Sequence, residues 1–265
     1  MTDKDFQGLT RSIERILGIQ CGCYKEDYIK RRVLSRMRIT GKENYKDYTT
    51  YFLSTESEKD LLRNALTINV TKFYRDKEVF DLVKTNIIPD ILRKKGRIRI
   101  WSAGCATGEE PYTLSIIIND ILRLKSDLQI TIFATDIDRE ALNKAKDGIY
   151  DKRSLENLSE GQIKRHFNQR DDGKFEVKPH LKEMIKFSQH DLMSQKAVTN
   201  YLDIILCRNV TIYFTEKQKN DLARMFHPAL LPNGFYIMGK TEFMSREVEN
   251  LYEPYNALQK IYTKK

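Results

Sequence analysis

The sequence lacks the features of a membrane-spanning, secreted or disordered protein. Its longest apolar run, around Leu114–Ile118, is far shorter than the ~20 residues that a membrane-spanning helix needs. The first residues, MTDKDFQG, contain no charged segment followed by an apolar one, as a signal peptide would. Only six prolines occur in 265 residues, and no stretch has low complexity, which argues against disorder. We therefore expect a folded protein that stays in the cytoplasm and does not insert into a membrane.

Cysteine is also scarce, and its spacing does not suit a metal or redox site. The sequence Cys21-x-Cys23 is one residue shorter than the CxxC spacing of such sites. The two other cysteines, Cys105 and Cys207, do not form a second pair. We expect four reduced thiols and no bound metal.

Positive charge, in contrast, is in excess and unevenly distributed. The formal net charge is +9, and the segment Lys25–Lys46 has eight Lys or Arg residues against three acidic ones. Such an excess suits nucleic acid, anionic lipid or an acidic protein surface, and charge alone does not choose among them.

Residues 3–68 have the pattern of short amphipathic helices. The predicted boundaries are an end at Gly18, a helix from about Glu26 to before Gly41, a start at Asn44, and a start near Ser57-x-x-Asp60, which is close to a capping box. The first part of the chain is therefore predicted to be all-helical.

After about residue 70, predicted strands alternate with predicted helices. The strand patterns are Arg97–Ala103, Gln129–Asp136, Tyr201–Cys207, Gly234–Met238 and Ala257–Tyr262, and the helical patterns start at Glu110 and cover Arg139–Lys146 and Glu216–Phe226. This alternation predicts an α/β fold with a mostly parallel sheet covered on both faces. Ligands bind outside the carboxyl ends of such strands, so the turns after Ala103, Thr135 and Cys207 are candidate site segments.

The turn after the first strand contains Gly104 and Gly108. Glycine allows a sharp turn and lets a ligand approach the backbone, although a tight strand-to-helix turn alone would also account for both. The fingerprint GxGxxG is absent, which disfavours a dinucleotide. The turn after the second strand, Asp136-Ile-Asp138, offers an acid to ribose hydroxyls, and as an alternative Asp138 could simply cap the next helix. Together the two turns predict an adenosine pocket without polyphosphate, which points to S-adenosylmethionine.

The turn after the third strand carries Arg208 and Asn209. Both side chains need polar partners when they leave water, so their place at the tip of an apolar strand indicates a binding role.

These segments resemble one known family. The sequences NVTKFYRD (69–76), WSAGCATGEEPYTL (101–114), ATDIDREALNKAKDGIY (134–150) and CRNVTIYF (207–214), with the helical start, are similar to the CheR-type chemotaxis receptor methyltransferases over essentially the whole chain. The resemblance implies a helical receptor-docking domain over residues 1–70 and a Rossmann-like methyltransferase domain over 71–265, with a β-hairpin subdomain at about 167–190. It implies transfer of a methyl group from S-adenosylmethionine to receptor glutamates for sensory adaptation, leaving S-adenosylhomocysteine.

The resemblance also assigns residues position by position. The expected cofactor-binding residues are Asn69, Thr71, Arg75, Gly104, Glu110, Asp136, Asp191, Leu192, Arg208 and Asn209. Arg208 and Tyr213 are the expected active-site pair that orients the substrate carboxylate and the cofactor, and Arg32, Arg36 and Arg38 are the expected docking residues. The chain departs from the family at Asp191, where asparagine is usual, and at Gly239-Lys240-Thr241-Glu242, where Gly-His-Ser-Glu is usual. No role is assigned to that second stretch.

The implied reaction needs no general base, because a glutamate with an ordinary pKa of about 4.3 is already an anion at neutral pH. The four histidines, His166, His180, His190 and His227, lie outside the motifs, and we interpret them as structural or surface residues. The enzyme's task is to position the carboxylate, the methyl carbon and the sulfur in line.

Partner expectations follow from the same segments. The turn Asp172-Gly173 within Phe167–Val177 predicts a hairpin. Its compact connection indicates that the enzyme does not capture a receptor's C-terminal peptide, so we expect a monomer that contacts receptors directly. Two alternatives stay open: an RNA methyltransferase whose N-terminal tyrosines (Tyr24, Tyr28, Tyr45, Tyr48, Tyr51) stack on bases, and a non-catalytic module that senses S-adenosylmethionine. We favour a protein that binds no nucleic acid, since the tyrosines have helical spacing.

Overall fold

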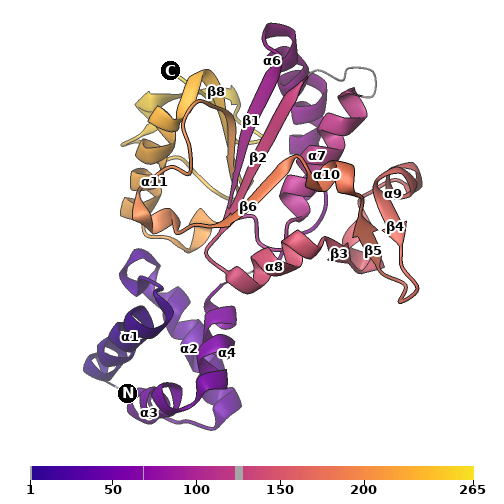
Figure 1. Ribbon diagram of the computed structural model, residues 1–265. Coiled ribbons are helices and arrows are strands. Elements are labelled where there is room, and N and C mark those ends of the chain that lie inside the picture. The colour runs from indigo at the N-terminus through magenta and orange to yellow at the C-terminus, as the bar shows by residue number, and fades with distance from the viewer. Residues whose placement is uncertain (1, 68, 123–127) are drawn as a thin grey trace. The chain divides into compact units, whose positions relative to one another are not determined.

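The chain folds into two compact units. The computed structural model describes residues 2–67, 69–122 and 128–265 (Figure 1). The helical unit comprises Met1–Ile68 and Tyr213–Lys219, and the α/β unit comprises Asn69–Ile212 and Asn220–Lys265. Within the described ranges, none of the helices combines the length and the apolar character needed to cross a membrane. The short segment 213–219 thus belongs to the helical unit although the residues on either side of it belong to the other one.

The helical unit follows the boundaries that the sequence predicts. Its elements are α1 (Asp3–Leu17), a 3-10 turn (Cys21–Cys23), α2 (Glu26–Thr40), α3 (Tyr45–Ser54) and α4 (Glu56–Leu66). Gly18 and Gly41 end α1 and α2 with φ values of 71° and 66°, a conformation that glycine adopts without strain. Asn44 caps α3 by accepting from the amide of Asp47. The capping box near Ser57 is wrong, because α4 starts at Glu56 after Thr55, whose side chain makes no capping bond.

Aromatic and aliphatic side chains fill the core of this unit. Leu9, Ile13, Val33 and Phe52 are fully buried, and each contributes about 1.5–3 kcal/mol by leaving water. Tyr28, Tyr45 and Tyr48 are buried in the same cluster, and Tyr24 and Tyr51 pack against it. The tyrosines therefore form the bundle core rather than an exposed surface for stacking bases.

The α/β unit is built on a seven-stranded sheet with the order β6-β2-β1-β7-β8-β10-β9. The strands are β1 (Arg97–Ala103), β2 (Gln129–Asp136), β6 (Ile185–Gln189), β7 (Leu202–Cys207), β8 (Leu230–Met238), β9 (Tyr252–Asn256) and β10 (Ile261–Lys264). The first five in spatial order are parallel, and β10 and β9 are antiparallel. This confirms the predicted α/β, Rossmann-like architecture.

Two strand predictions need correction. The strand predicted over Ala257–Tyr262 is wrong, because its first part is the turn between β9 and β10 and the apolar side chain of Leu258 is 80% exposed there. Strand β6 was not predicted, and only Ile185 of its five residues is buried. A strand at the edge of a sheet carries a weak alternation signal for that reason.

Helices cover both faces of the sheet, as Figure 1 shows for α7 (Glu109–Leu122) and α11 (Glu216–Ala229). Successive residues of a strand face opposite sides. Accordingly, Ile98 and Ile100 of β1 join the core cluster that contains residues of α7, whereas the Trp101 ring lies 5.3 Å from the Phe226 ring of α11. The remaining helices of this unit are α5 (Lys77–Leu82), a π-helical turn (Val83–Ile87), α6 (Ile88–Lys94), α8 (Arg139–Asp147), α9 (Glu160–His166) and α10 (Pro179–Lys182).

A second, small sheet contains the predicted hairpin. Strands β4 (Phe167–Gln169) and β5 (Phe175–Val177) pair antiparallel around Asp172-Gly173, and β3 (Ile149–Tyr150) pairs with the other edge of β5. Figure 1 shows this sheet beside α9. The small sheet does not reach residue 190, because Ile185–Gln189 pairs with β2 in the large sheet.

The strand order creates a switch point next to β1. From β1 the chain continues to β2 and β6 on one side, whereas β7 and β8 lie on the other side. The turns after β1, β2 and β7 therefore meet at one edge, where parallel α/β sheets bind ligands.

Candidate functional site

The turn after β1 requires glycine at two positions. Gly104 and Gly108 have φ values of 85° and 95°. A Cβ atom at Gly104 would lie 2.5 Å from Cγ2 of Val210, and one at Gly108 would lie 2.9 Å from Cβ of Ala145. Both glycines thus serve the tight turn, and Gly104 also allows the turn after β7 to approach.

Asp136 joins the turn after β1 to the end of β2. Its carboxylate accepts from the amide of Ala106 at 2.8 Å and from the amide of Asp138 at 2.9 Å. Burial raises the pKa of Asp136, and the bonds from these amides act in the opposite direction. Each carboxylate oxygen has a further lone pair, so Asp136 can still accept from a ribose hydroxyl.

Asp138 is a helix cap, as the alternative interpretation of this turn proposed. One of its oxygens accepts from the amides of Glu140 and Ala141 at the start of α8. The other accepts from the side-chain amide of Asn69 at 2.7 Å. The predicted cofactor residue Asn69 is thereby brought to the end of β2.

Arg208 lies at the centre of a charged group that we call the Arg208 cluster, formed by Arg208, Asp76, Glu110 and the backbone carbonyl of Arg75. Its guanidinium donates to Oδ2 of Asp76 at 2.7 Å, to Oε2 of Glu110 at 3.1 Å and to the Arg75 carbonyl at 2.9 Å. The side chain is 2% exposed and lies 5.1 Å from the Phe80 ring centroid. Asp76 was not predicted as a site residue, although it ends the NVTKFYRD segment.

The Arg208 cluster fits S-adenosylmethionine by its charge. One guanidinium faces two carboxylates, so the cluster has one uncompensated negative charge in a region largely withdrawn from water. The buried Nε atom of Arg208 has no hydrogen-bond partner in the described chain. The sulfonium and ammonium groups of the cofactor outnumber its carboxylate, so an excess negative charge attracts it, whereas the same charge would repel a polyphosphate.

The segment that precedes the cluster has a strained backbone. Tyr74 and Asp76 have φ values of 49° and 60°, which cost of order 1–3 kcal/mol each and tend to cluster at functional sites. Arg75 is half-exposed, and its guanidinium donates to the carbonyl of Val70 at 2.9 Å. Thr71 is half-buried on the same segment. The structure thus brings Arg75 beside the cluster through its backbone.

The predicted adenine pair follows β6, next to β2. Asp191 accepts from the amide of Met193 and starts a 3-10 turn (Leu192–Ser194), and Leu192 is buried. The amide of the preceding residue, His190, donates to the carbonyl of Asp136. Residues 191 and 192 are therefore held close to the end of β2.

Tyr213 is not brought together with these residues inside the α/β unit. It belongs to the helical unit, where its ring lies 4.7 Å from that of Tyr28 and its carbonyl accepts from the amide of Lys25. Its role in orienting the substrate stays a prediction.

The three predicted docking arginines of α2 have different surroundings. Arg38 is exposed, and Arg32 is half-buried with its guanidinium 5.5 Å from the Tyr28 ring centroid. Arg36 makes two bonds to the carboxylate of Glu58, at 3.0 and 2.7 Å, and its side chain is only 12% exposed. Arg36 is thus a structural residue of the helical unit in addition to any docking role.

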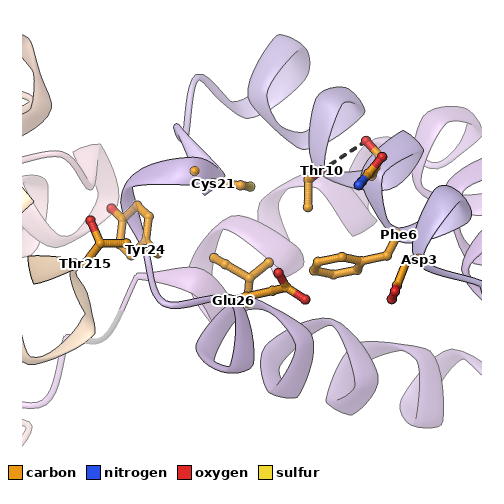
Figure 2. A pocket seen from close by; sticks show the side chains of 10 residues that line it. Asp3, Phe6, Thr10, Cys21, Tyr24, Glu26 and Thr215 are labelled. Atoms are coloured by element: carbon orange, nitrogen blue, oxygen red, sulfur yellow. Dashed lines mark hydrogen bonds between the residues drawn. The ribbon is translucent and has the colours of Figure 1, made fainter. Parts of the chain in front are cut away.

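The helical unit also contains an open pocket of about 460 Å³. Its lining residues include Phe6 and Glu26, both labelled in Figure 2. The carboxylates of Asp3 and Glu26, which line it, lie 3.7 and 2.5 Å from Nζ of Lys30. None of the predicted site residues lines this pocket, and its two acids do not suit an acidic partner.

The buried cysteines beside the site are not reactive nucleophiles. Burial raises the pKa of the Cys105 thiol and that of the Cys207 thiol well above the usual value of a cysteine. Both thiols therefore remain protonated at neutral pH. Within the described parts of the chain, no group of His, Cys, Asp or Glu side chains is arranged to hold a metal ion.

Comparison with known proteins matches both units to one family. Residues 69–260 match the CheR methyltransferase SAM-binding domain, and residues 4–67 match the CheR methyltransferase all-alpha domain. A chemotaxis protein methyltransferase of Borreliella burgdorferi is 32% identical, covering 91% of this chain and 89% of its own. One of Salmonella typhimurium is 33% identical, covering 94% and 86%. A TehB-like SAM-dependent methyltransferase of Corynebacterium glutamicum has a TM-score of 0.41 at 15% identity, covering 79% and 95%.

Proposed function

This chain belongs to the CheR methyltransferase family, and from that premise we propose that it methylates glutamate side chains of chemotaxis receptors. Its α/β unit is an S-adenosylmethionine-binding domain. The observation that carries the proposal is the Arg208 cluster, whose excess negative charge lies where the three carboxyl-end turns meet. An RNA substrate finds no support, because the tyrosines that would stack on bases form the core of the helical unit.

In this proposal, the turns after β1, β2, β6 and β7 and the segment 69–75 each hold one part of the cofactor. Asp136 accepts from the ribose hydroxyls, Asp191 and Leu192 flank the adenine, and Arg75 pairs with the methionine carboxylate. Glu110 and Arg208, with Asn69, Thr71, Gly104 and Asn209, shape the methionyl end. When bound, S-adenosylmethionine supplies a methyl group activated by its sulfonium.

The residues of the chain then have only to orient a nucleophile that is already charged. The receptor glutamate needs no general base. Arg208 is held by Asp76 and Glu110, so it acts through a fixed guanidinium that does not bind the substrate carboxylate tightly enough to suppress its nucleophilicity. Tyr213 contacts the incoming carboxylate in this scheme.

Receptor docking is assigned to the basic side of α2. Arg38 and Arg32 have guanidinium groups that no carboxylate of the described chain holds, so they are available to acidic helices of a receptor in the cytoplasm. Arg36 supports this side by fixing α2 to α4 through Glu58. In this proposal the enzyme acts as a monomer. It works without a C-terminal peptide tether, since the β4–β5 hairpin is compact. Micromolar binding of receptor C-terminal peptides would contradict the absence of a tether.

The test is transfer of a labelled methyl group from S-adenosylmethionine to three acceptors: receptor cytoplasmic fragments, the same fragments with their candidate glutamates changed to alanine, and total RNA. We expect label on the unchanged fragments alone, and mild base should release it as methanol because a glutamyl methyl ester hydrolyses readily. Label on RNA would favour the nucleic-acid alternative. Tight cofactor binding without any transfer would favour the sensor.

A further inference from the structure

The turn after β7 is held by a buried carboxylate that the sequence did not single out. Glu242, which follows β8, is 2% exposed. Its Oε2 accepts from the amides of Asn209 and Gly239 at 2.9 and 2.6 Å. Its Oε1 accepts from the amides of Val210 and Thr211 at 3.1 and 2.7 Å and from the Thr211 hydroxyl at 2.7 Å.

These five bonds determine the shape of the turn. Three consecutive amides, from Asn209 to Thr211, converge on the carboxylate, and converging amides form a site for an anion. Asn209 has a φ of 59°, a left-handed conformation that needs support from outside the residue. Every partner that the described chain offers the Glu242 carboxylate is a neutral N–H or O–H group, so the carboxylate is bound by the turn itself.

The 208–211 turn packs against the expected cofactor site. Val210 lies against Gly104, where a Cβ atom would be 2.5 Å from its Cγ2 atom. Gly239 is equally restricted, since a Cβ atom there would lie 2.7 Å from Oε2 of Glu242 and 2.8 Å from the Asn209 amide. A shift of the turn would therefore move Arg208, Asn209 and the contact on Gly104 together.

We propose that Glu242 is a positioning residue for S-adenosylmethionine, holding the 208–211 turn in the conformation that completes the cofactor site. The proposal rests on the proposed function and adds a residue to it. The neighbouring departure from the family pattern, Lys240, does not take part in this arrangement, because its Nζ atom bonds to Glu78 of α5 at 2.7 Å.

The decisive variant is Glu242→Gln. The amide keeps the size of the side chain, but in either orientation its NH₂ group faces at least two of the backbone amides that now donate to Glu242. A donor facing donors leaves two of these four amides without an acceptor, while the remaining carbonyl oxygen still accepts from the other two. We expect the dissociation constant for S-adenosylhomocysteine, measured by calorimetry below the melting transition, to rise about tenfold to hundredfold.

The matched control is Asp203→Asn on β7, the strand that leads into the 208–211 turn. Asp203 is also buried, accepts from the amide of Arg99 and pairs with Lys95, but lies near the amino end of β7. We expect it to lower the melting temperature while the dissociation constant changes by less than about twofold. If Glu242→Gln does not fold, Thr211→Val, which removes only the hydroxyl bond, should raise the dissociation constant about threefold or more.

The outcomes are distinct. Unchanged affinity in folded Glu242→Gln would overturn the proposal. If Glu242→Gln does not fold, unchanged affinity in Thr211→Val would overturn it instead. A loss of affinity in Asp203→Asn as large as in the test variant would also overturn it. If the wild-type chain itself does not bind S-adenosylhomocysteine, the proposed function fails as well. A loss confined to the Glu242 and Thr211 variants supports the inference.

Discussion

Two arginines of this protein are held by carboxylates away from water, and the two arrangements differ. In the helical unit, Arg36 makes two bonds to Glu58, and the Tyr48 hydroxyl donates to the same carboxylate at 2.7 Å. The charges balance there, and the hydrogen bonds that Arg36 donates to Glu58 raise the pKa of Arg36. In the α/β unit, Arg208 faces two carboxylates, and its Nε atom has no hydrogen-bond partner among the described residues.

The difference separates an arrangement that stabilises a fold from one that is ready for a ligand. The balanced pair sits among regular helices, α2, α3 and α4. The unbalanced cluster lies beside left-handed residues at Tyr74, Asp76 and Asn209. Backbone strain and uncompensated charge both raise the free energy of the folded chain, and a ligand of opposite charge can recover part of it.

The largest effect should come from Arg208→Ala. It leaves Asp76 and Glu110 facing each other without a cation, and breaking a largely buried pair costs about 3 kcal/mol or more. Although the variant is more negative, Asp76, Glu110 and the Arg75 carbonyl lose the guanidinium that fixes them. We therefore expect a lower melting temperature and, from the lost geometry of the site, a fall in S-adenosylhomocysteine affinity of about 100-fold, measured by calorimetry. Wild-type affinity in the folded variant would show that the cluster is only structural.

Glu58→Gln should lower the stability of the helical unit without weakening cofactor binding, in contrast to Arg208→Ala. It removes the countercharge of Arg36, and we expect the helical unit to lose about 1–3 kcal/mol of stability, read from hydrogen exchange of α2 and α4 amides. Cofactor affinity should remain within about twofold. If this variant lost affinity as Arg208→Ala does, the two arrangements would not differ in function.

Asp136→Ala tests the ribose contact within the α/β unit. We expect the affinity for S-adenosylmethionine and S-adenosylhomocysteine to fall by about 1–3 kcal/mol through the loss of charged hydrogen bonds. Asp138→Ala serves as a comparison, because its carboxylate caps α8 and also holds Asn69. We expect it to lower stability by about 1 kcal/mol and to weaken affinity less than Asp136→Ala does. Calorimetry on both variants decides which acid belongs to the site.

The double variant Arg32→Ala, Arg38→Ala tests docking. We expect kcat/KM for receptor methylation to fall about tenfold at low salt and less at high salt, because exposed charges act on encounter and are screened. Cofactor affinity should stay unchanged. Equal methylation by wild type and variant at low salt would show that this side of α2 is only solvated.

The smallest effect concerns pH and distinguishes the two units directly. All four histidines lie in the α/β unit, and burial lowers the pKa of each below the usual value of about 6.5. The best buried, His166, contacts Asp120 and His180 at 3.2 Å each, and Arg165 opposes its protonation. The unfolded chain therefore binds more protons below about pH 6.5, so stability is lost as the pH falls.

Hydrogen exchange at pH 7 and pH 5.5 checks this prediction. We expect amides of the α/β unit to lose protection between these values, with amides around α9 and α10 showing the clearest change. The helical unit contains no histidine and should change little over the same range. Equal losses in both units would contradict the assignment to histidine.

The sequence by itself determined the local features of the protein. The ends of α1 and α2 follow from Gly18 and Gly41, because only glycine adopts the left-handed conformation without strain. Strands β1 and β2 follow from alternating apolar residues, and their carboxyl ends predicted where the candidate site would lie. Each of these features depends only on residues within one helical turn or one strand, so the local sequence is enough to predict it.

Only the tertiary structure decided which side chains are partners. Arg208 meets Glu110 and Asp76, which are 98 and 132 residues away, and Arg36 meets Glu58 across 22 residues. Glu242 reaches the 209–211 turn from a segment for which no role was predicted. Partners of this kind cannot be inferred from local propensity, because the order of strands in the sheet and the packing of helices bring distant residues together, and a buried charge is tolerated only where that packing supplies its partner.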